Sequence, residues 1–351
     1  MCPYSLSLPG GVQGQVLGLA RALRALGHQA RVLGPCDGPP PEVGVIPLGN
    51  TVATLANGSV APIAPDLPCV LRTIRALRDE SFDVLHLHEP LAPGPTLTSV
   101  VFSSAPTVGT FHAAGGSAAY RWLRPLTRWL GRRLSLRCAV SEDARDLAAR
   151  ALGGDYMLLY NGIDVERFAK ATPWPTNSPT VVFLSRHEAR KGLGVLLAAR
   201  EHLPGDVRLW VASDGPETDR LRAEVGGDHR VEWLGRLTEE EKAGRLRGAD
   251  VLCAPSLHGE SFGMVLLEGM AAQTPIVASD LPGYRNVARH GREALLVPPG
   301  DPVALARAIT RLLEEPSTAA TLVAGGEARA AEFSMDLLAE RYLELYRTAP
   351  R

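Results

Sequence analysis

The feature that most constrains the fold is an alternation of short apolar runs with amphipathic stretches. Apolar residues first recur every three or four positions, at Val12, Val16, Leu19, Leu23 and Leu26. This spacing predicts one buried face of a helix. Strand-like runs such as QARVLGP, DVLHLHE and PTVGTFH follow, with helical patterns between most of them. Because strands that alternate with helices pair in parallel and are covered on both faces, the pattern predicts a doubly wound α/β sheet.

A proline-rich segment interrupts this alternation once. The stretch ERFAKATPWPTNSPT carries Pro173, Pro175 and Pro179, so residues 169–177 read as a linker. The alternation then restarts with TVVFLSR and continues through VRLWVAS, DVLCAPS and PIVASD.

The chain is therefore expected to form two domains. We place the first α/β domain at residues 1–168 and the second at residues 178–330. Residues 331–351 are expected to form a C-terminal helix that packs back toward the first domain. Two doubly wound domains in tandem offer a ligand cleft between the carboxyl ends of their sheets.

Composition argues against several classes of protein. The 351 residues carry a net charge of −1, so no general attraction to nucleic acid is expected. The five cysteines are scattered without a CxxC pair, which disfavours a disulfide framework or a zinc site. No apolar run is long enough to span a bilayer, and the N-terminal residues lack the basic start of a signal peptide. We expect a cytoplasmic protein, and a monomer.

The strongest chemical signal is the stretch GESFGMVLLEGM. Ser261, Phe262 and Gly263 lie at the expected start of a helix, where unpaired backbone N–H groups favour an anion such as a diphosphate. Glu260 and Glu268 offer carboxylates that accept hydrogen bonds from sugar and ribose hydroxyls. Taken alone, the spacing favours a simpler interpretation, in which Glu260 is a first-turn acid stabilised by the helix dipole and Glu268 is a surface residue.

Three further signals are weaker. Arg186 ends the strand-like run FLSR and Lys191 begins the next helical pattern, so two cations at the carboxyl edge of a sheet would suit a leaving diphosphate. Either one alone is readily a solvated surface charge. His112 follows the run TVGTF, although a lone histidine is more often structural than catalytic. The opening PGGVQ reads as a glycine-rich loop before a helix, a place for an anion or a sugar.

Together these motifs resemble one family. PGGVQ, HLHEP, TFH, AVSEDAR, YNGIDVERF, the Arg186/Lys191 pair, GPE and the two glutamates occur in the family's order with its gaps. The chain is similar over nearly its whole length to the retaining glycosyltransferases of family 4, which implies the GT-B fold of two Rossmann-like domains facing a central cleft. CPYS, NGSVA, FDVLHLHEP and GESFGMVLLE resemble most closely the actinobacterial phosphatidylinositol α-mannosyltransferases.

The resemblance implies a nucleotide-sugar donor on the second domain, which is GDP-mannose in the close relatives. It assigns Glu260 to the donor sugar and Glu268 to the ribose. Arg186 and Lys191 would neutralise the departing β-phosphate, where negative charge develops. The donor loop is completed by three neighbouring residues: Ser261, Phe262 and Gly263.

In the first domain, the resemblance places Gly11 against the diphosphate and His112 against the donor sugar near the reacting carbon. Closure of the domains would exclude water from the donor. Retention of configuration would need no protein nucleophile, since the leaving phosphate can receive the acceptor proton on the same face. The sequence contains no DxD metal motif. We expect no cofactor for the chemistry, and Mg²⁺ at most as a counter-ion of the diphosphate.

The acceptor side departs from the family's pattern. Tyr4, Gln13 and Asn57 match positions near the inositol headgroup in the relatives. The relatives also carry basic residues after NGSVA and a lysine past the TFH motif, where this chain has PIAPD and AAGGSAA. Two acceptors therefore stay open. One is a phosphatidylinositol-type lipid or related polyol, and the other is a soluble molecule used with another nucleotide sugar.

An arginine-rich stretch, YRWLRPLTRWLGRRLSLR, favours the lipid. It supplies the basic and aromatic residues of a helical surface: Arg121, Trp122, Arg124, Arg128, Trp129 and Arg132. Basic side chains beside Trp and Leu suit an anionic bilayer, so we expect peripheral attachment to the inner face of the plasma membrane. The alternative is an ordinary amphipathic helix whose Trp and Leu side packs on the sheet, and the two can coexist.

Two local departures carry structural expectations. Relatives begin a few residues earlier, with a strand inside the first sheet. We therefore expect this strand to be missing here, through a late start site or a trimmed chain, which would expose apolar neighbours. At Gln273, relatives have glycine in a turn, and we expect only a local change of the backbone.

Two other classes are less well supported. A non-catalytic sugar-nucleotide-binding protein on the same scaffold is disfavoured, because the expected catalytic histidine, both cations and both glutamates are present. A nicotinamide-dependent enzyme is weaker still, since no GxGxxG motif follows a strand-like run.

Overall fold

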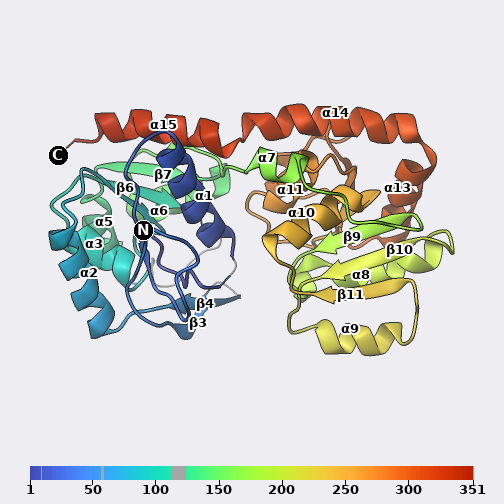
Figure 1. Cartoon of the computed structure of the whole chain (residues 1–351), viewed down its shortest axis with the longest axis horizontal. Helices are drawn as coiled ribbons and strands as arrows, with labels where there is room; N and C mark the ends of the chain where they lie inside the picture. Colours follow the sequence, from blue (N-terminus) through green and yellow to red (C-terminus); the bar gives the residue numbers. More distant parts are fainter. Residues whose placement is uncertain (9, 57–58, 113–123, 351) are drawn as a thin grey trace. The chain divides into compact units, whose positions relative to one another are not determined.

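The computed structural model describes residues 1–8, 10–56, 59–112 and 124–350, with the side chains at 53–56, 59–61 and 124 left outside the description. The chain divides into two compact units (Figure 1). The first unit combines Met1–Gly162 with Met335–Arg351, and the second is Ile163–Ser334. Residues 163–168, the expected linker 169–177 and residues 331–334 were all expected outside the second domain, and all belong to the second unit.

Parallel strands form the centre of the first unit. Four strands make one sheet in the order β5-β6-β7-β8, β1 pairs in parallel with β2, and β3 forms an antiparallel hairpin with β4. Their bounds are β1 Val32–Gly34, β2 Val45–Pro47, β3 Val52–Ala56, β4 Ser59–Ile63, β5 Leu85–His88, β6 Thr107–Phe111, β7 Leu136–Ala139 and β8 Met157–Leu158.

Helices cover this unit in two groups. The helix bounds are α1 Gly11–Ala25, α2 Leu67–Asp79, α3 Pro95–Phe102, α5 Arg124–Gly131, α6 Glu142–Leu152 and α15 Met335–Thr348. One buried cluster joins the strands to α2, α3, α5 and α6, with Leu87, Val100 and Leu152 among its members. A second cluster joins them to α1 and α15 through residues such as Leu19 and Tyr342. The last helix of the chain is therefore part of the first unit.

The first two residues occupy the place where a first strand was expected. The backbone N–H of Cys2 donates to the carbonyl of Leu33 at 2.9 Å, and the N–H of His88 donates to the carbonyl of Met1 at 3.1 Å. The Met1 amine also donates to the carbonyl of His86 at 2.6 Å. No named strand precedes α1 in the described chain, yet Met1 and Cys2 bridge β1 and β5 with strand-like hydrogen bonds, and both residues are buried.

The second unit has one continuous parallel sheet of six strands. Their order is β11-β10-β9-β12-β13-β14, with β9 and β12 at the centre. The strand bounds are β9 Thr180–Leu184, β10 Arg208–Ala212, β11 Val231–Gly235, β12 Val251–Ala254, β13 Ile276–Ser279 and β14 Leu295–Val297. The central strands are buried on both faces, as their continuous apolar runs predict.

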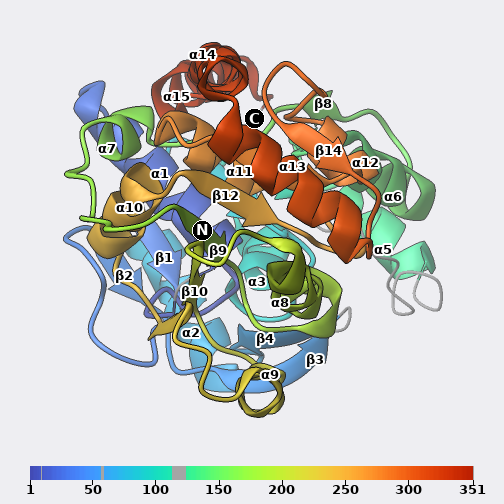
Figure 2. The same cartoon turned by 90° about the vertical axis from the view of Figure 1, so that its right-hand side faces the viewer.

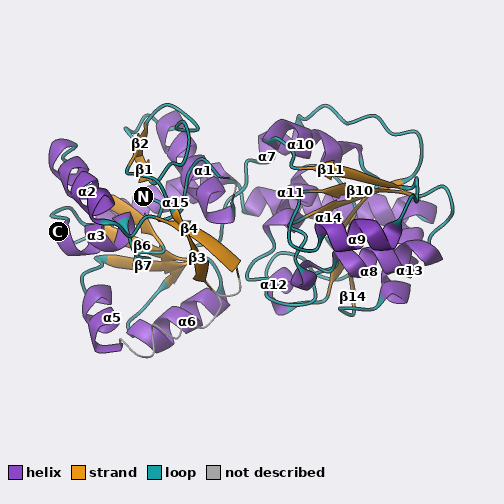
Figure 3. Ribbon diagram, turned by 90° about the horizontal axis from the view of Figure 1, so that it is seen from below, coloured by secondary structure: helices purple, strands orange, loops and turns teal. Residues whose placement is uncertain are grey.

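Helices lie on both faces of this sheet. Helices α8, α9 and α13 share one apolar core with the strands, with α8 beside α13 (Figure 2). Helices α10 and α11 lie on the other face (Figure 3). The helix bounds are α7 Val165–Ala169, α8 Leu193–Ala199, α9 Thr218–Val225, α10 Glu239–Gly248, α11 Met264–Ala271, α12 Pro282–Arg285, α13 Pro302–Glu314 and α14 Pro316–Glu332, with short 3₁₀ turns at Ala189–Lys191 and Arg200–His202.

The segment expected to be a linker is held against α10. The backbone N–H of Trp174 donates to the carbonyl of Gly244 at 2.9 Å. The guanidinium of Arg245 lies between two indole rings, 4.2 Å from the centroid of Trp174 and 4.3 Å from that of Trp210. Gly248 leaves room for this contact, because a Cβ there would collide with the Trp174 backbone. Cation–π contacts of this kind fix the segment to the second unit.

Gln273 adopts a backbone conformation that favours glycine. Its φ is +59°, in the left-handed region, at the turn between α11 and β13. The Gln273 side chain accepts a hydrogen bond from Arg247 and donates one to Glu327. These two contacts offset the cost of a left-handed non-glycine residue, which is about 1–2 kcal/mol.

Two substitutions at this turn should separate the backbone cost from the side-chain contacts. Gln273→Ala and Gln273→Gly both remove the contacts with Arg247 and Glu327, but only glycine relieves the left-handed strain. We expect the glycine variant to be more stable than the alanine variant by about 1 kcal/mol, measured by urea unfolding. Equal stability of the two variants would show that the turn is unstrained.

Candidate functional site

The carboxyl ends of β9 and β12 bring the main sequence signals of the second unit together. The two strands pair in parallel, so their ends meet at the same edge of the sheet. Arg186 and Lys191 lie in the segment after β9, and Glu260 lies in the loop after β12. Lys191 ends a 3₁₀ turn before α8, and α8 itself begins at Leu193.

Lys191 and Glu260 form a close ion pair. The Lys191 ammonium lies 2.5 Å from Glu260 Oε1, and the side chains are only 17% and 11% exposed. The Ser256 hydroxyl donates to the same oxygen at 2.8 Å, and the guanidinium of Arg190 lies 3.9 Å away. Charges of opposite sign attract more strongly when they are partly removed from water, so burial strengthens the attraction within this pair.

A glycine permits the two loops to approach. Gly192 has a φ of +71°, and a Cβ there would collide with the carbonyl oxygen of Pro255. The N–H of Leu257 also donates to the carbonyl of Arg190 at 2.7 Å. Without this approach, the Lys191 ammonium could not reach the Glu260 carboxylate.

Arg186 is oriented by a neighbour on its own loop. Its guanidinium lies 3.0 Å from Glu188 Oε1, while the other oxygen of Glu188 accepts from Arg190 Nε at 2.8 Å. The Arg186 side chain is 52% exposed, so an anion from solvent can reach it.

Helix α11 begins where the sequence predicted. Gly263 caps the helix with a φ of +94°, and the backbone N–H groups of the first turn point out of its N-terminus. Ser261 accepts from the Asn286 amide through its carbonyl at 3.2 Å. The Phe262 side chain is 2% exposed and packs on the Phe333 ring, so only the Phe262 backbone can face a ligand.

Glu268 on α11 forms a second lysine–glutamate pair. The Lys242 ammonium lies 2.8 Å from Glu268 Oε1 and 3.1 Å from Glu239, and 5.6 Å above the Phe168 ring centroid. Burial alone would lower the pKa of Lys242, but the two carboxylates raise it above its ordinary value. Lys242 therefore remains charged and holds the Glu268 carboxylate in one place.

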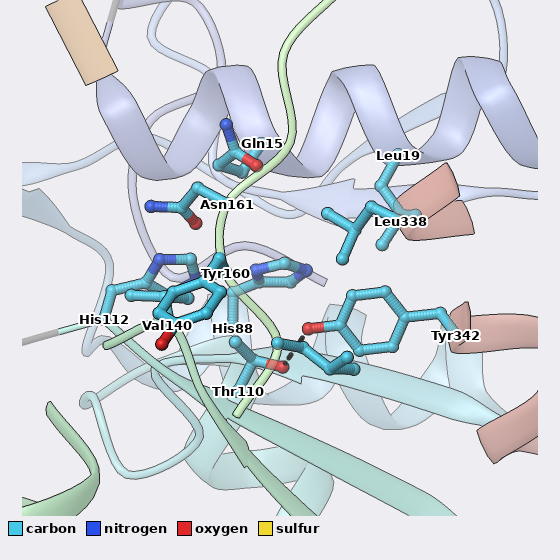
Figure 4. Close-up of a pocket in the computed structure, with 11 residues that line it drawn as sticks. Gln15, Leu19, His88, Thr110, His112, Val140, Tyr160, Asn161, Leu338 and Tyr342 are labelled. Atoms are coloured by element: carbon cyan, nitrogen blue, oxygen red, sulfur yellow. Dashed lines mark hydrogen bonds between the residues drawn. The ribbon is translucent and has the colours of Figure 1, made fainter. Parts of the chain in front are cut away.

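In the first unit, His112 lies beside a second histidine (Figure 4). His112 Nε2 and His88 Nδ1 are 2.9 Å apart, and the rings are stacked. The backbone N–H of His112 donates to Glu89 Oε1 at 2.7 Å. Glu89 has a φ of +49° and directly follows β5. His88 and Glu89 therefore fix the ring and the backbone of His112.

The contacts continue to a third histidine and to α15. His86 stacks on His88 with 4.2 Å between ring centroids. Its Nδ1 lies 2.7 Å from the Tyr346 hydroxyl and its Nε2 lies 2.7 Å from the Thr110 hydroxyl. Thr110 in turn lies 3.0 Å from the Tyr342 hydroxyl. The three imidazoles therefore form one array across β5 and β6.

Burial keeps these histidines neutral. It lowers the pKa of His112 to about 4, and it lowers the pKa values of His86 and His88 well below their ordinary value. Near neutral pH, the His112–His88 contact is thus a hydrogen bond between two uncharged rings, in which one nitrogen donates and the other accepts.

A small cavity lies beside the array. It has a volume of about 10 Å³, room for a single water molecule, and His88, His112 and Asn161 are among the residues that line it (Figure 4). On its border, the Gln15 amide donates to the carbonyl of Gly162 at 2.7 Å and accepts from the Gly162 N–H at 2.9 Å. Gln15 therefore ties α1 to the segment that closes the cavity.

The N-terminal loop holds its expected residues differently. Gly11 is exposed and is the first residue of α1. The Gln13 side chain is buried, and its amide donates to the carbonyl of Ser5 at 3.2 Å. This hydrogen bond ties the N-terminal loop to the first turn of α1. Tyr4 forms an isolated bridge with Ile63, and burial raises its pKa above its ordinary value. Asn57 lies outside the described residues.

Part of the arginine-rich surface falls on α5. Arg128, Trp129 and Arg132 are exposed, and Trp129 keeps 50% of its surface in solvent with the Arg133 guanidinium 5.4 Å from its ring centroid. Leu130 is buried, so this helix also packs through its apolar side. Three expected residues lie outside the description, wholly or in their side chains: Arg121, Trp122 and Arg124.

Sequence reasoning missed several residues of these contacts. The run HLH places His86 and His88 two apart, on one face of a strand, and that spacing was the available signal. Ser256 and Lys242 left no comparable signal, because their partners lie on other elements of the fold.

Two kinds of feature are absent from the part of the chain that the structure describes. In residues 1–8, 10–56, 59–112 and 124–350, no three or more His, Cys, Asp or Glu residues gather as a metal site would require. In the same part of the chain, no helix has the length and apolarity needed to cross a membrane.

Comparison with known proteins agrees with these motifs. Residues 9–167 match the family model described as Glycosyltransferase Family 4, and residues 178–315 match that of Glycosyl transferases group 1. A phosphatidyl-myo-inositol mannosyltransferase of Mycobacterium leprae is 40% identical, over 99% of this chain and 96% of its own. A D-inositol 3-phosphate glycosyltransferase of Xylanimonas cellulosilytica is 30% identical, over 97% of this chain and 92% of its own.

Solved structures show the same fold. The Anabaena protein HepE in complex with UDP and glucose has a TM-score of 0.77 at 20% identity, covering 99% of this chain and 98% of that one. WaaG, a glycosyltransferase involved in lipopolysaccharide biosynthesis, has a TM-score of 0.68 at 16% identity and covers 98% of both chains.

The buried histidines predict a pH-dependent stability. Below pH 6.5 the unfolded chain binds protons that the folded array cannot, so the free energy of unfolding should fall as the pH drops from about 7 to about 5. Each histidine contributes up to about 1.4 kcal/mol per pH unit.

Chemical unfolding at both pH values should show a smaller fall in the free energy of unfolding for His86→Gln than for the wild type. His28→Gln, at an exposed histidine, should behave as the wild type. An unchanged fall in the His86 variant would contradict the assignment.

Proposed function

The chain belongs to the family 4 glycosyltransferases and has their GT-B fold, and we propose that it transfers mannose from GDP-mannose to a phosphatidylinositol-type lipid with retention of configuration. The name of the Mycobacterium leprae relative, at 40% identity over 99% of the chain, supports this acceptor and this sugar.

A glycosyltransferase with a soluble acceptor is the second candidate. The 30% identical D-inositol 3-phosphate glycosyltransferase and the stretch PIAPD, which has no basic residue, favour it.

The observation that carries the proposal is the Lys191–Glu260 pair beside the start of α11. A diphosphate entering this edge competes with the Glu260 carboxylate for the Lys191 ammonium. As Lys191 turns to the phosphate, Glu260 becomes available to accept hydrogen bonds from hydroxyls of the donor sugar. Ion-pair exchange of this kind lets the empty site keep both charges neutralised.

The other proposed donor residues follow the same logic. The half-exposed Arg186 adds a second cation for the β-phosphate, so charge is stabilised where it develops as the glycosidic bond breaks. Ser261, Phe262 and Gly263 offer backbone N–H groups to the diphosphate. Glu268, held by Lys242, accepts from the ribose hydroxyls.

In the first unit we assign three roles. His112 contacts the donor sugar as a neutral imidazole, which can donate or accept a hydrogen bond without adding charge. Gly11, exposed at the start of α1, offers backbone to the diphosphate. Tyr4, Gln13 and Asn57 are assigned to the acceptor headgroup.

Catalysis in this scheme needs no protein nucleophile. The departing phosphate accepts the proton of the acceptor hydroxyl on the same face of the sugar on which the new bond forms. Arg186 and Lys191 stabilise the negative charge of that phosphate. Mg²⁺, if bound, would neutralise diphosphate charge.

We further propose that α5 attaches the protein to the inner face of the plasma membrane. The exposed Arg128 and Arg132 attract anionic headgroups, and the half-exposed Trp129 suits the interfacial region of a bilayer.

A thermal-shift screen of GDP-mannose, UDP-glucose and ADP-glucose tests the donor. A ligand at about one hundred times its Kd stabilises a protein by about 2.7 kcal/mol, and we expect the largest shift with GDP-mannose.

Lys191→Ala and Glu260→Ala should lower mannose transfer to phosphatidylinositol by about a hundredfold or more. Lys170→Ala, which removes an exposed lysine paired with Glu166, serves as the control. Wild-type turnover in either site variant would refute the assignment, and no shift with any nucleotide sugar would refute the function.

Liposome sedimentation tests the membrane surface. The protein should sediment with phosphatidylglycerol vesicles at low salt and be released at high salt, because salt screens exposed charges. The double variant Arg128→Gln, Trp129→Ala should bind more weakly, whereas Arg311→Gln on α13 should bind as the wild type. Failure of the wild type to sediment at low salt would rule out attachment through this surface.

A further inference from the structure

Glu260 has a buried partner that the proposed chemistry does not use. The Ser256 hydroxyl lies 2.8 Å from Glu260 Oε1 and 3.0 Å from the Tyr284 hydroxyl. Ser256 is 2% exposed and Tyr284 is 1% exposed. A tyrosine, a serine and the site carboxylate are thus joined in one line away from solvent.

The chemistry of the three groups fixes the direction of both hydrogen bonds. An ionised carboxylate has no proton and only accepts, so the single Ser256 proton goes to Glu260. The Ser256 oxygen then accepts from the Tyr284 hydroxyl. Burial and the nearby Glu260 charge raise the pKa of Tyr284 above its ordinary value, so the phenol keeps the proton that it donates.

The surrounding backbone holds this line rigidly. Ser256 follows β12 and Tyr284 lies on α12 after β13, and the two strands are neighbours in the sheet. Gly283 allows α12 to lie against the Glu260 backbone, because a Cβ there would collide with the Glu260 carbonyl. Gly263 does the same for the Tyr284 ring, since a Cβ would lie 2.9 Å from it. Each hydroxyl is therefore placed by packed elements and not by a mobile loop alone.

We infer that Tyr284 and Ser256 position the Glu260 carboxylate for the donor sugar, an inference that rests on the proposed function of Glu260. Lys191 and Ser256 share the same oxygen, Oε1. When a diphosphate draws Lys191 away, Ser256 remains as the anchor of Oε1. Oε2 is then presented to a sugar hydroxyl in a fixed orientation. Tyr284 acts indirectly. It orients the Ser256 hydroxyl so that the Ser256 proton points at the Glu260 carboxylate.

The inference predicts an effect on the sugar and not on the nucleotide. Isothermal titration calorimetry of the full chain compares GDP-mannose with GDP, and UDP-glucose with UDP, for the wild type, Tyr284→Phe and Ser256→Ala. Each variant removes one hydroxyl and keeps the rest of the side chain's shape. For the pair that binds the wild type, we expect the nucleotide sugar to bind about three- to tenfold more weakly to both variants, with binding of the bare nucleotide unchanged. Tyr156→Phe, the same substitution in the first unit, should leave both affinities unchanged.

The outcomes separate the inference from the function on which it rests. Wild-type affinity for the nucleotide sugar in both variants would overturn the positioning role while the proposed function stands. An equal loss for nucleotide sugar and bare nucleotide would assign Tyr284 and Ser256 to the support of the fold, and would also overturn it. A wild type that binds neither nucleotide sugar would overturn the proposed function and the inference together.

Discussion

Parallel pairing of β9 with β12 is the constraint on which the candidate donor site depends. It brings two loops to one edge of the sheet, and the left-handed Gly192 allows them to touch. The Lys191 ammonium and the Glu260 carboxylate then meet at 2.5 Å, and Ser256 and Tyr284 are joined to the carboxylate by successive hydrogen bonds. The sheet thus supplies the geometry, and the side chains supply charges that a diphosphate and a sugar can exchange.

The segment after the first unit shows how composition can mislead about mobility. Prolines at 173, 175 and 179 are typical of a linker, yet Trp174 lies on Arg245 and its backbone bonds to Gly244. The two indoles and the guanidinium come from residues 174, 210 and 245, which no local pattern connects. The proline-rich stretch therefore belongs to the second unit, although its composition is typical of a free linker.

The sequence predicted the fold class because alternating apolar periods decide it. It also predicted the start of α11. Lys191 and Glu260 were singled out by their places in the chain together with the resemblance to family 4, since the spacing alone favoured a simpler interpretation of Glu260. It did not predict that Phe262 turns inward, that Gln13 closes its own loop, or that His88 holds the ring of His112. Those features depend on side-chain directions and on register between strands distant in the chain. The run HLH shows one face of a strand, but not which neighbour that face meets.

The scarcity of lysine has a practical consequence. The chain has three lysines among 37 basic residues, and two of them hold the two glutamates of the candidate donor site. Lys170 is 73% exposed, whereas Lys191 and Lys242 are 17% and 20% exposed. An amine-acylating reagent therefore modifies few side chains, and modification of the two site lysines is readily separated by mass from that of Lys170. A molecule bound at the site would protect those two amines from acylation. The extent of acylation at Lys191 and Lys242 would therefore report how much of the site is occupied.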